Sequence, residues 1–353
     1  MKKRIQIFDT CWDVHYQWNM IFSLKEVCDF YFCLNTVKQW NSTQYPIPQN
    51  LKFVTHYEPH SYDVAILHID EEIIGMDHQK RMMYEQFDEI ITDIPKIVIN
   101  HGIPVFPERF RKPRRAIAET LMRKECIRIV KELIKSNTMV VHSFTGASKL
   151  EWGFGVPIIP GIDSNTYIDL PKEPRIYIDP PDFHYYSYYN YNCLLPVLNE
   201  LSDKYGYHTN ILSADGQNNL LISNYKEYLG RSLLFLDTSY RMPLNNVRIE
   251  AMLSGCCVLQ VEGAHDLERW AKPDKNIVLL PNDPKNIILK IINFLEEKYT
   301  EAIKIGIAGK ETAMKEFSIE KFRNQWIEVL DFVINKKMNG QYRIDGYNTC
   351  KSF

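Results

Sequence analysis

Residues 229–281 read LGRSLLFLDTSYRMPLNNVRIEAMLSGCCVLQVEGAHDLERWAKPDKNIVLLP, and this stretch decides the fold. A short apolar strand at 233–236 is followed by a polar loop and by a helix at 246–254, which Gly255 closes. A second apolar strand at 256–261 comes directly after the helix. A strand, a helix and a second strand in this order form a βαβ crossover, so the two strands are predicted to be parallel neighbours.

The loop of this crossover is a predicted anion site. Ligands of parallel sheets bind at the carboxyl ends of strands, where the free amides of a helix N-terminus meet anions. The amides of Asn245, Asn246 and Val247 lack intrahelical partners and are expected to face a phosphate, although Asn245 also serves as a simple helix cap. Ser239 and Arg241 lie in the same loop, and a guanidinium binds phosphate in a bidentate fork unless it is only a surface arginine.

Length, charge and cysteines restrict the class of protein. A chain of 353 residues exceeds the roughly 100 to 200 residues of one domain, so two domains are expected. A net charge of -2 gives no overall reason to expect nucleic acid as a partner. The eight cysteines include no Cys-x-x-Cys pair, which favours reduced buried thiols. With no signal-peptide pattern and no apolar run of roughly 20 residues, a cytoplasmic protein is expected.

Strands and helices alternate twice along the chain. In the first half, strands are expected at 4–8, 27–34, 51–55, 62–68, 97–100 and 138–142, a long helix at 116–136, a loop at 9–19 and an interdomain turn at 152–162. In the second half, strands are expected at 175–178, 208–212, 233–236, 256–261 and 276–280, and helices at 193–205, 219–229, 246–254, 284–299, 301–316 and 318–335. Two alternating halves predict an α/β fold of two doubly wound, Rossmann-like domains that face each other across a cleft.

The expected domain boundaries follow from this alternation. Residues 1–165 form a first domain, and residues 166–317 form a second. The helix at 318–335 is expected to pack back on the first domain, and residues 336–353 form a polar tail.

Three segments carry a resemblance to a known group. Residues 140–167 have a serine after a strand and then a Pro-Gly-Ile-Asp turn, residues 248–258 (RIEAMLSGCCV) have a glutamate-Ala-Met-x-x-Gly-x-x-Val pattern, and residues 276–295 have a strand, an Asp-Pro turn and a helix. With IVINHGIP at 97–104, these segments resemble the GT-B glycosyltransferases, and within them the family 4 type of nucleotide-sugar-dependent enzymes. The resemblance is specific from about residue 229 to 295.

The resemblance implies an enzyme that moves a sugar from a UDP- or GDP-linked donor to a glycan or lipid-linked acceptor. The second domain would bind the nucleotide, and Glu250 would accept two ribose hydroxyls, because a carboxylate offers two acceptor atoms. A solvated or helix-capping glutamate is the plainer interpretation. The resemblance implies retention at the anomeric carbon more than inversion. No metal or other cofactor is expected, because no Asp-x-Asp motif stands out.

Candidate catalytic residues follow the strands of the first half. His101 comes after the strand at 97–100 and would contact the transferred sugar, or act as a base if the reaction inverts. Asp13 and His15 follow the first strand and are alternative bases, with His15 on the acceptor side. His68 and Asp70 end another strand and are weaker candidates. A structural role is the alternative for each of them.

A basic segment lies near His101. Residues 107–115, PERFRKPRR, include five cations: Arg109, Arg111, Lys112, Arg114 and Arg115. They form either a solvated loop or an acceptor-side patch for a lipid-linked phosphate, a phospholipid surface or nucleic acid. The second interpretation would bring residues 109–115 into peripheral contact with the inner face of a membrane.

The chain departs from the family at three places. Met242 stands where the first of two glutamates is usual, the first strand is not followed by a glycine-rich loop, and residues 178–192 (IDPPDFHYYSYYNYN) replace the usual Arg and Lys of the diphosphate clamp. The aromatic run at 183–191 either stacks on a base or sugar or packs internally. Met242 and the missing clamp leave one alternative, a catalytically silent GT-B-like binding protein. The basic segment at 107–115 leaves another, an enzyme that glycosylates a nucleic acid base, although the overall charge argues against it.

Overall fold

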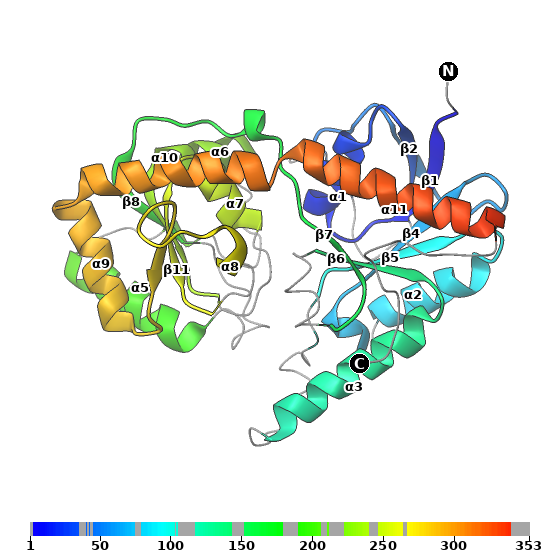
Figure 1. Ribbon diagram of the computed structural model, residues 1–353, viewed down its shortest axis with the longest axis horizontal. Helices are drawn as coiled ribbons and strands as arrows, with labels where there is room; N and C mark the ends of the chain where they lie inside the picture. The colour runs from blue at the N-terminus through cyan, green and yellow to red at the C-terminus, as the bar shows by residue number, and fades with distance from the viewer. Residues whose placement is uncertain are drawn as a thin grey trace. The chain divides into compact units, whose positions relative to one another are not determined.

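The structure, a computed structural model, describes residues 3–34, 40, 42, 45–74, 79–102, 104, 117–142, 152–178, 190–205, 210–211, 222–239, 246–263 and 267–339. The chain divides into two compact units. The first comprises Met1–Gly161 and Ile319–Phe353, and the second comprises Ile162–Ser318. Each unit contains a parallel sheet with helices packed against it (Figure 1). The second unit therefore begins slightly before the boundary at residue 165 that the sequence indicated.

The sheet of the first unit has the order β3-β2-β1-β4-β5-β6-β7, and its described strand pairs are all parallel. Its strands are β1 (Ile5–Thr10), β2 (Cys28–Cys33), β3 (Leu51–Val54), β4 (Val64–Ile69), β5 (Lys96–Asn100), β6 (Thr138–His142) and β7 (Val156–Ile158). The strand order reverses between β1 and β4. In a doubly wound sheet, the carboxyl ends of these two strands mark the expected ligand site.

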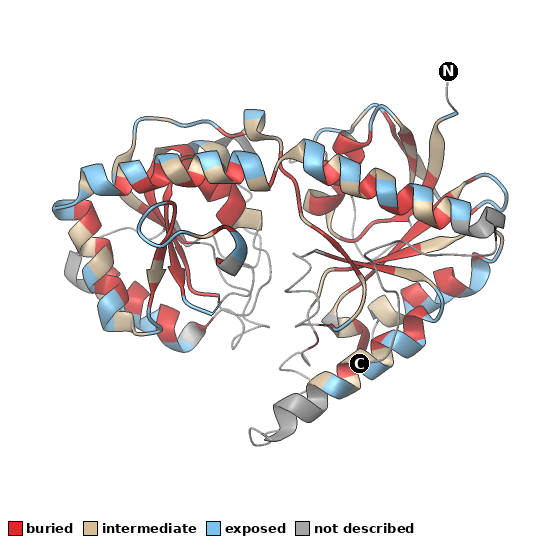
Figure 2. Cartoon of the chain, viewed as in Figure 1, coloured by how far each residue is buried: buried red, intermediate tan, exposed pale blue. Residues whose placement is uncertain are grey.

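Helices cover both faces of this sheet because its strands are apolar on both sides. The helices of this unit are α1 (Val14–Ser23), α2 (Gln79–Ile90), α3 (Ile117–Ile134) and α11 (Ile319–Asn339), with a 3-10 turn η1 (Glu71–Ile74). Ile66 packs in a core shared with α1 and α11, and the next residue, Leu67, packs in a core shared with α2 and α3. Figure 2 shows the buried strands between these helices.

Two predictions for the first unit are wrong. Residues 9–19 were expected to be a loop, but α1 begins at Val14, and the Asp13 carboxylate caps it by accepting the amide of Tyr16 at 3.3 Å. Half-exposed aromatic residues of α1, Trp18 and Phe22, hid its periodicity. Residues 152–162 were expected to be a turn, but they contain β7, which pairs with β6 at the edge of the sheet.

The second unit has the sheet order β12-β11-β10-β8-β9, again parallel in its described pairs, and the order reverses between β8 and β10. Its strands are β8 (Glu173–Ile178), β9 (Asn210–Ile211), β10 (Ser232–Asp237), β11 (Cys257–Val261) and β12 (Val278–Leu280). Its helices are α5 (Tyr191–Tyr205), α6 (Ile222–Arg231), α7 (Asn246–Leu253), α8 (Leu267–Trp270), α9 (Pro284–Glu296) and α10 (Tyr299–Glu316), with a 3-10 turn η3 (Ser164–Thr166).

The crossover that opened the sequence analysis is confirmed. Strand β10 pairs in parallel with β11, and α7 connects them. Gly255 ends α7 with a φ of +77°, and a Cβ at this position would lie 2.8 Å from an oxygen of Asp169, so the turn requires glycine. A Cβ on Gly306 would lie 2.3 Å from the carbonyl oxygen of Gly255, so glycine there allows α10 to pack closely on the end of α7.

Among the helices in the described ranges, none combines the length and the apolar character needed to cross a membrane. The cysteines in the described part of the chain are buried, as the sequence indicated.

Candidate functional site

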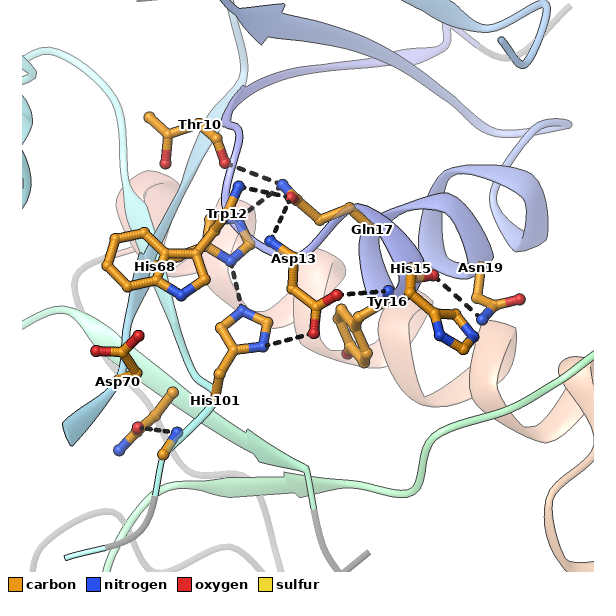
Figure 3. A network of polar contacts seen from close by, with 12 residues as sticks. Thr10, Trp12, Asp13, His15, Tyr16, Gln17, Asn19, His68, Asp70 and His101 are labelled. Carbon is orange, nitrogen blue, oxygen red and sulfur yellow. Dashed lines mark hydrogen bonds and ion pairs between the residues drawn. The ribbon is translucent and has the colours of Figure 1, made fainter. Parts of the chain in front are cut away.

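A buried polar network lies at the switch point of the first unit. Asp9 is near the end of β1, His68 is near the end of β4, and His101 directly follows β5. Since β1, β4 and β5 are adjacent parallel strands, their carboxyl ends bring these three side chains together. Figure 3 shows the rings of His68 and His101 next to Asp13 and Gln17 of the α1 region.

The network is a chain of short contacts. The Nε2 atom of His68 lies 2.8 Å from Oδ1 of Asp9, and both side chains are fully buried. The Nδ1 atom of His68 lies 2.8 Å from Nε2 of His101, whose ring is stacked on it. The Nδ1 atom of His101 lies 3.8 Å from Oδ2 of Asp13, and the Asp13 side chain is 40% exposed. The chain therefore runs from a buried carboxylate to one that solvent reaches.

Gln17 fixes the buried end of this chain. Its Oε1 accepts the amides of Trp12 and Asp13 at 2.9 and 3.1 Å. Its Nε2 donates to Oδ1 of Asp9 at 3.0 Å and to the carbonyl of Thr10 at 2.9 Å. The oxygen and the nitrogen of this side-chain amide both have hydrogen-bond partners, so the orientation of the amide is determined.

Burial dominates the electrostatics of Asp9. Desolvation raises the pKa of its carboxyl group, while the neighbouring His68 and the donors around it act in the opposite direction. Oδ2 of Asp9 is buried without a hydrogen-bond partner in the described part of the chain. An ionised carboxylate at this position is therefore held mainly by the contacts to Oδ1.

The turn after β5 is also fixed. The Oδ1 atom of Asn100 accepts the amide of Gly102 at 3.0 Å, and the indole of Trp152 donates to the carbonyl of Gly102 at 3.3 Å. The ring of Tyr16 contacts His101 edge-on, with centroids 5.6 Å apart. The Tyr16 hydroxyl accepts the indole N–H of Trp326 on α11 at 3.2 Å. These contacts hold the imidazole of His101 in one orientation.

Two other candidates of the first unit have different surroundings. Asp70 forms an ion pair with Lys80, whose ammonium group also lies 2.9 Å from Glu72 and above the ring of Trp12. Burial raises the pKa of Asp70, and Lys80 opposes the shift. The ring of His15 stacks on Tyr45 with centroids 5.8 Å apart. Asp70 is thus tied into a structural ion pair, and His15 lies farther along α1 than Asp13.

In the second unit, Glu250 is buried in α7. The hydroxyl of Tyr225 on α6 donates a hydrogen bond to Oε2 of Glu250. Burial and the nearby carboxylate raise the pKa of Tyr225 well above its usual value, so this hydroxyl remains a donor. One oxygen of the predicted ribose-binding carboxylate is therefore occupied by a hydroxyl group of the protein itself.

A buried arginine beside Glu250 was missed by the sequence analysis. Nη1 of Arg248 donates to Oε1 of Gln260 at 2.7 Å and lies 3.8 Å from Oδ2 of Asp237. Oδ1 of Asp237 accepts the hydroxyl of Ser239 at 2.5 Å, and Nε2 of Gln260 donates to the carbonyl of Ser239 at 2.7 Å. This network fixes the backbone where the chain leaves β10. Arg248 and Glu250, two charged residues in a short and mostly apolar helix, were the available signal.

The remaining candidates divide into two groups. Asn246 and Val247 open α7 as expected. Asp163, the aspartate of the Pro-Gly-Ile-Asp turn, accepts the amide of Asn165 at 3.0 Å. The other candidates lie outside the described residues: Arg109, Arg111 and Lys112 with the rest of 107–115, the aromatic run at 183–189, and Arg241, Met242 and Asn245. In the described ranges, no cluster of three or more His, Cys, Asp or Glu side chains is arranged to hold a metal ion.

Solved structures with a similar fold align with nearly the whole length of this chain. HepE of Anabaena, solved in complex with UDP-glucose, has a TM-score of 0.63 and 14% identity, with 93% of this chain and 100% of that chain covered. Sucrose-phosphate synthase of Thermosynechococcus elongatus has a TM-score of 0.64 and 12% identity, with coverages of 94% and 100%. A glycosyltransferase of Rickettsia africae has a TM-score of 0.59 and 12% identity, with coverages of 94% and 99%.

At these identities the similarity concerns the fold. No protein-family model and no curated protein matches the sequence. The expected two-domain, Rossmann-like fold of the GT-B type is confirmed. The finer assignment to family 4 stays a prediction.

Proposed function

We propose that this protein is a glycosyltransferase that moves a sugar from a nucleotide-sugar donor to an acceptor. The observation that carries the proposal is the full-length similarity of fold to HepE, a protein solved with UDP-glucose. The sequence pattern around Glu250 supports it independently, since the predicted nucleotide site coincides with the β10–α7 crossover at the switch point of the second sheet.

The second unit would bind the donor. The amides of Asn246 and Val247 at the start of α7 would meet the diphosphate, together with Arg241, Asn245 and Ser239 of the preceding loop. These amides and Arg241 would stabilise the negative charge that develops on the leaving diphosphate, so a metal ion is not required. Glu250 would accept hydrogen bonds from the ribose hydroxyls. The hydroxyl of Tyr225 would then have to move away from Oε2 of Glu250.

The first unit would bind the acceptor, a glycan or a lipid-linked sugar. His101 and Asp13 at the switch point would contact the reacting sugar, and His15 would lie on the acceptor side. The cations Arg109, Arg111 and Lys112 would attract a lipid-linked phosphate and bring the protein to the inner face of a membrane in the cytoplasm. Retention at the anomeric carbon, which needs no protein base, is the outcome that the resemblance to the family 4 enzymes implies.

A binding protein without catalysis is the second candidate. The contact between Tyr225 and Glu250 favours it, because a hydroxyl of the chain fills the place of a ribose hydroxyl. Hydrolysis of a donor sugar, or its transfer to acceptors in a cell extract, separates the two functions. Turnover of the donor excludes the binding protein, and nucleotide binding without turnover excludes the enzyme.

A further inference from the structure

We propose that Arg248 and Gln260 are positioning residues for the diphosphate of the donor, because they tie the first turn of α7 to the carboxyl ends of β10 and β11. The inference deepens the proposed function and rests on it. Its basis is a buried polar network at the end of the sheet where the donor phosphates are proposed to bind.

Arg248 is a charged residue in the interior of the second unit. Its side chain is 1% exposed, and its guanidinium carbon lies 5.5 Å from the centre of the Trp270 ring. Replacing a buried ion pair by apolar side chains of similar volume often leaves a fold as stable, or makes it more stable. The geometry and the charge that this network imposes therefore explain it better than a gain in stability does.

Gln260 transmits the constraint from Arg248 to the end of β10. A guanidinium only donates hydrogen bonds, so the amide oxygen of Gln260 faces Nη1 of Arg248, which is 2.7 Å away. The amide nitrogen then faces the carbonyl oxygens of Asp237 and Ser239, at 3.2 and 2.7 Å. Because Gln260 pairs with Asp237 across the two strands, this side chain joins α7, β11 and the end of β10.

Ser239 is the anchor point of this network on the backbone. Its amide and its hydroxyl both donate to Oδ1 of Asp237, at 2.9 and 2.5 Å, and its carbonyl accepts from Gln260. The residue is 2% exposed. The chain therefore leaves β10 in a fixed direction, and Arg248 fixes the first turn of α7 against the same point.

Asp237 gives the network an electrostatic role. Its carboxylate lies at the carboxyl end of β10, where an anionic ligand of a parallel sheet is expected. A carboxylate whose charge is not offset would repel a diphosphate from this end of the sheet. Nη1 of Arg248 lies 3.8 Å from Oδ2 of Asp237, so the guanidinium offsets this charge.

The predicted ribose contact is held by a different element. Glu250 lies in the same helix as Arg248, but its Oε2 accepts the hydroxyl of Tyr225 on α6. A change in the Arg248 network is therefore expected to affect the phosphates more than the ribose. UDP carries a base, a ribose and a diphosphate, whereas uridine carries only the base and the ribose, so the two ligands separate these effects.

The test compares UDP with uridine by calorimetric titration of full-length variants. Arg248→Gln removes the guanidinium, and Lys172→Gln is the matched control. Lys172 is also a buried cation of the second unit, but it donates to the carbonyls of Gly230 and Ser254 at the other end of α7. Arg248→Gln is expected to raise the Kd for UDP at least about tenfold and the Kd for uridine less than about twofold. Lys172→Gln should change both constants by the same factor.

A second substitution separates the charge of Arg248 from a general loss of structure. In the Arg248→Gln background, Asp237→Asn should restore part of the affinity for UDP, because it removes the charge that Arg248 offset. The amide oxygen of the new side chain can still accept the amide of Ser239. Equal losses of UDP and uridine in Arg248→Gln, or a double variant that binds UDP no better than Arg248→Gln, overturns the proposal.

The last measurement needs no ligand. Gln260→Glu retains Arg248 but removes the amide donor to the carbonyl of Ser239. Hydrogen exchange at the amide of Ser239 should be at least about tenfold faster in Gln260→Glu than in the wild type, and unchanged in Lys172→Gln. Gln260→Glu should also show the selective loss of UDP. Equal exchange in Gln260→Glu and the wild type overturns the inference, whereas faster exchange in a protein that binds no nucleotide contradicts the proposed function.

Discussion

The hydroxyl of Tyr225 donates a hydrogen bond to Oε2 of Glu250, and both residues belong to the second unit. A nucleotide that places its ribose on Glu250 must compete with this hydroxyl. Under the proposed function, the phenol of Tyr225 occupies the place of one ribose hydroxyl.

Tyr225→Phe is expected to tighten nucleotide binding, because the ribose then no longer competes with the Tyr225 hydroxyl for this carboxylate. A hydrogen bond to a charged group contributes about 1.5–3 kcal/mol, part of which is lost to water, so the Kd for UDP should fall by roughly threefold to tenfold. Calorimetric titration of the variant measures this change. A Kd equal to that of the wild type, or a larger one, argues against competition at Glu250.

Glu250→Gln is expected to weaken nucleotide binding by at least about tenfold, because the amide offers one acceptor oxygen where the carboxylate offers two charged ones. The matched control is Glu297→Gln, an exposed glutamate at the end of α9. Titration of UDP into both variants separates the two sites. Equal affinities of the two variants for UDP would show that Glu250 does not bind the nucleotide.

Asp88 is expected to make the first unit sensitive to acid. Burial acts to raise the pKa of its carboxyl group, but donors from Lys96, Lys135 and Asn137 outweigh burial and lower it. A carboxyl group with a lowered folded-state pKa adds stability above its unfolded pKa, about 3.9, and loses that contribution as the pH falls through the folded value.

Asp88→Asn should therefore lower the free energy of unfolding by about 1–3 kcal/mol at pH 6 and by less near pH 3. Urea denaturation of the variant and the wild type at the two pH values measures the difference. A loss that does not depend on pH would show that the charge of Asp88 contributes nothing.

Trp326 of α11 is expected to be the most sensitive position of the last helix. Its side chain is fully buried in the core of the first unit, and its indole donates to the hydroxyl of Tyr16. Trp326→Ala should cost about 3–5 kcal/mol, as large-to-small substitutions in cores do, whereas Trp326→Phe should cost less. Denaturant unfolding of the two variants measures how much free energy of unfolding each one loses. Equal losses in the two variants would contradict the prediction.

Local patterns predicted much of this fold. The β10–α7–β11 crossover follows from two apolar runs, a polar loop and Gly255, since each signal lies within a few residues of the next. Helix α1 did not follow, because its half-exposed aromatic residues mask the periodicity and only Asp13 signals its start. Strand β7 was missed because a segment with glycines and prolines is typical of a turn, and its pairing with β6 is a tertiary contact.

The candidate site was predictable only in part. His68 and His101 were identified as residues at strand ends, but that β4 and β5 are neighbours follows from the strand order, which the sequence does not display. Asp9 was read as part of a loop, so its hydrogen bond to His68 was not foreseen. Arg248 was missed for a similar reason, because its partners Asp237 and Gln260 lie on two different strands.

The central claim is that the second unit binds the nucleotide of a sugar donor through Glu250. Its most direct test is a titration of UDP-, GDP- and ADP-sugars in which thermal unfolding of the protein is measured. The wild type should be stabilised by at least one of these donors, by about 2.7 kcal/mol at a hundredfold excess over Kd. Glu250→Gln should lose most of this stabilisation. The absence of stabilisation by all three donors, or equal stabilisation of Glu250→Gln, would contradict the claim.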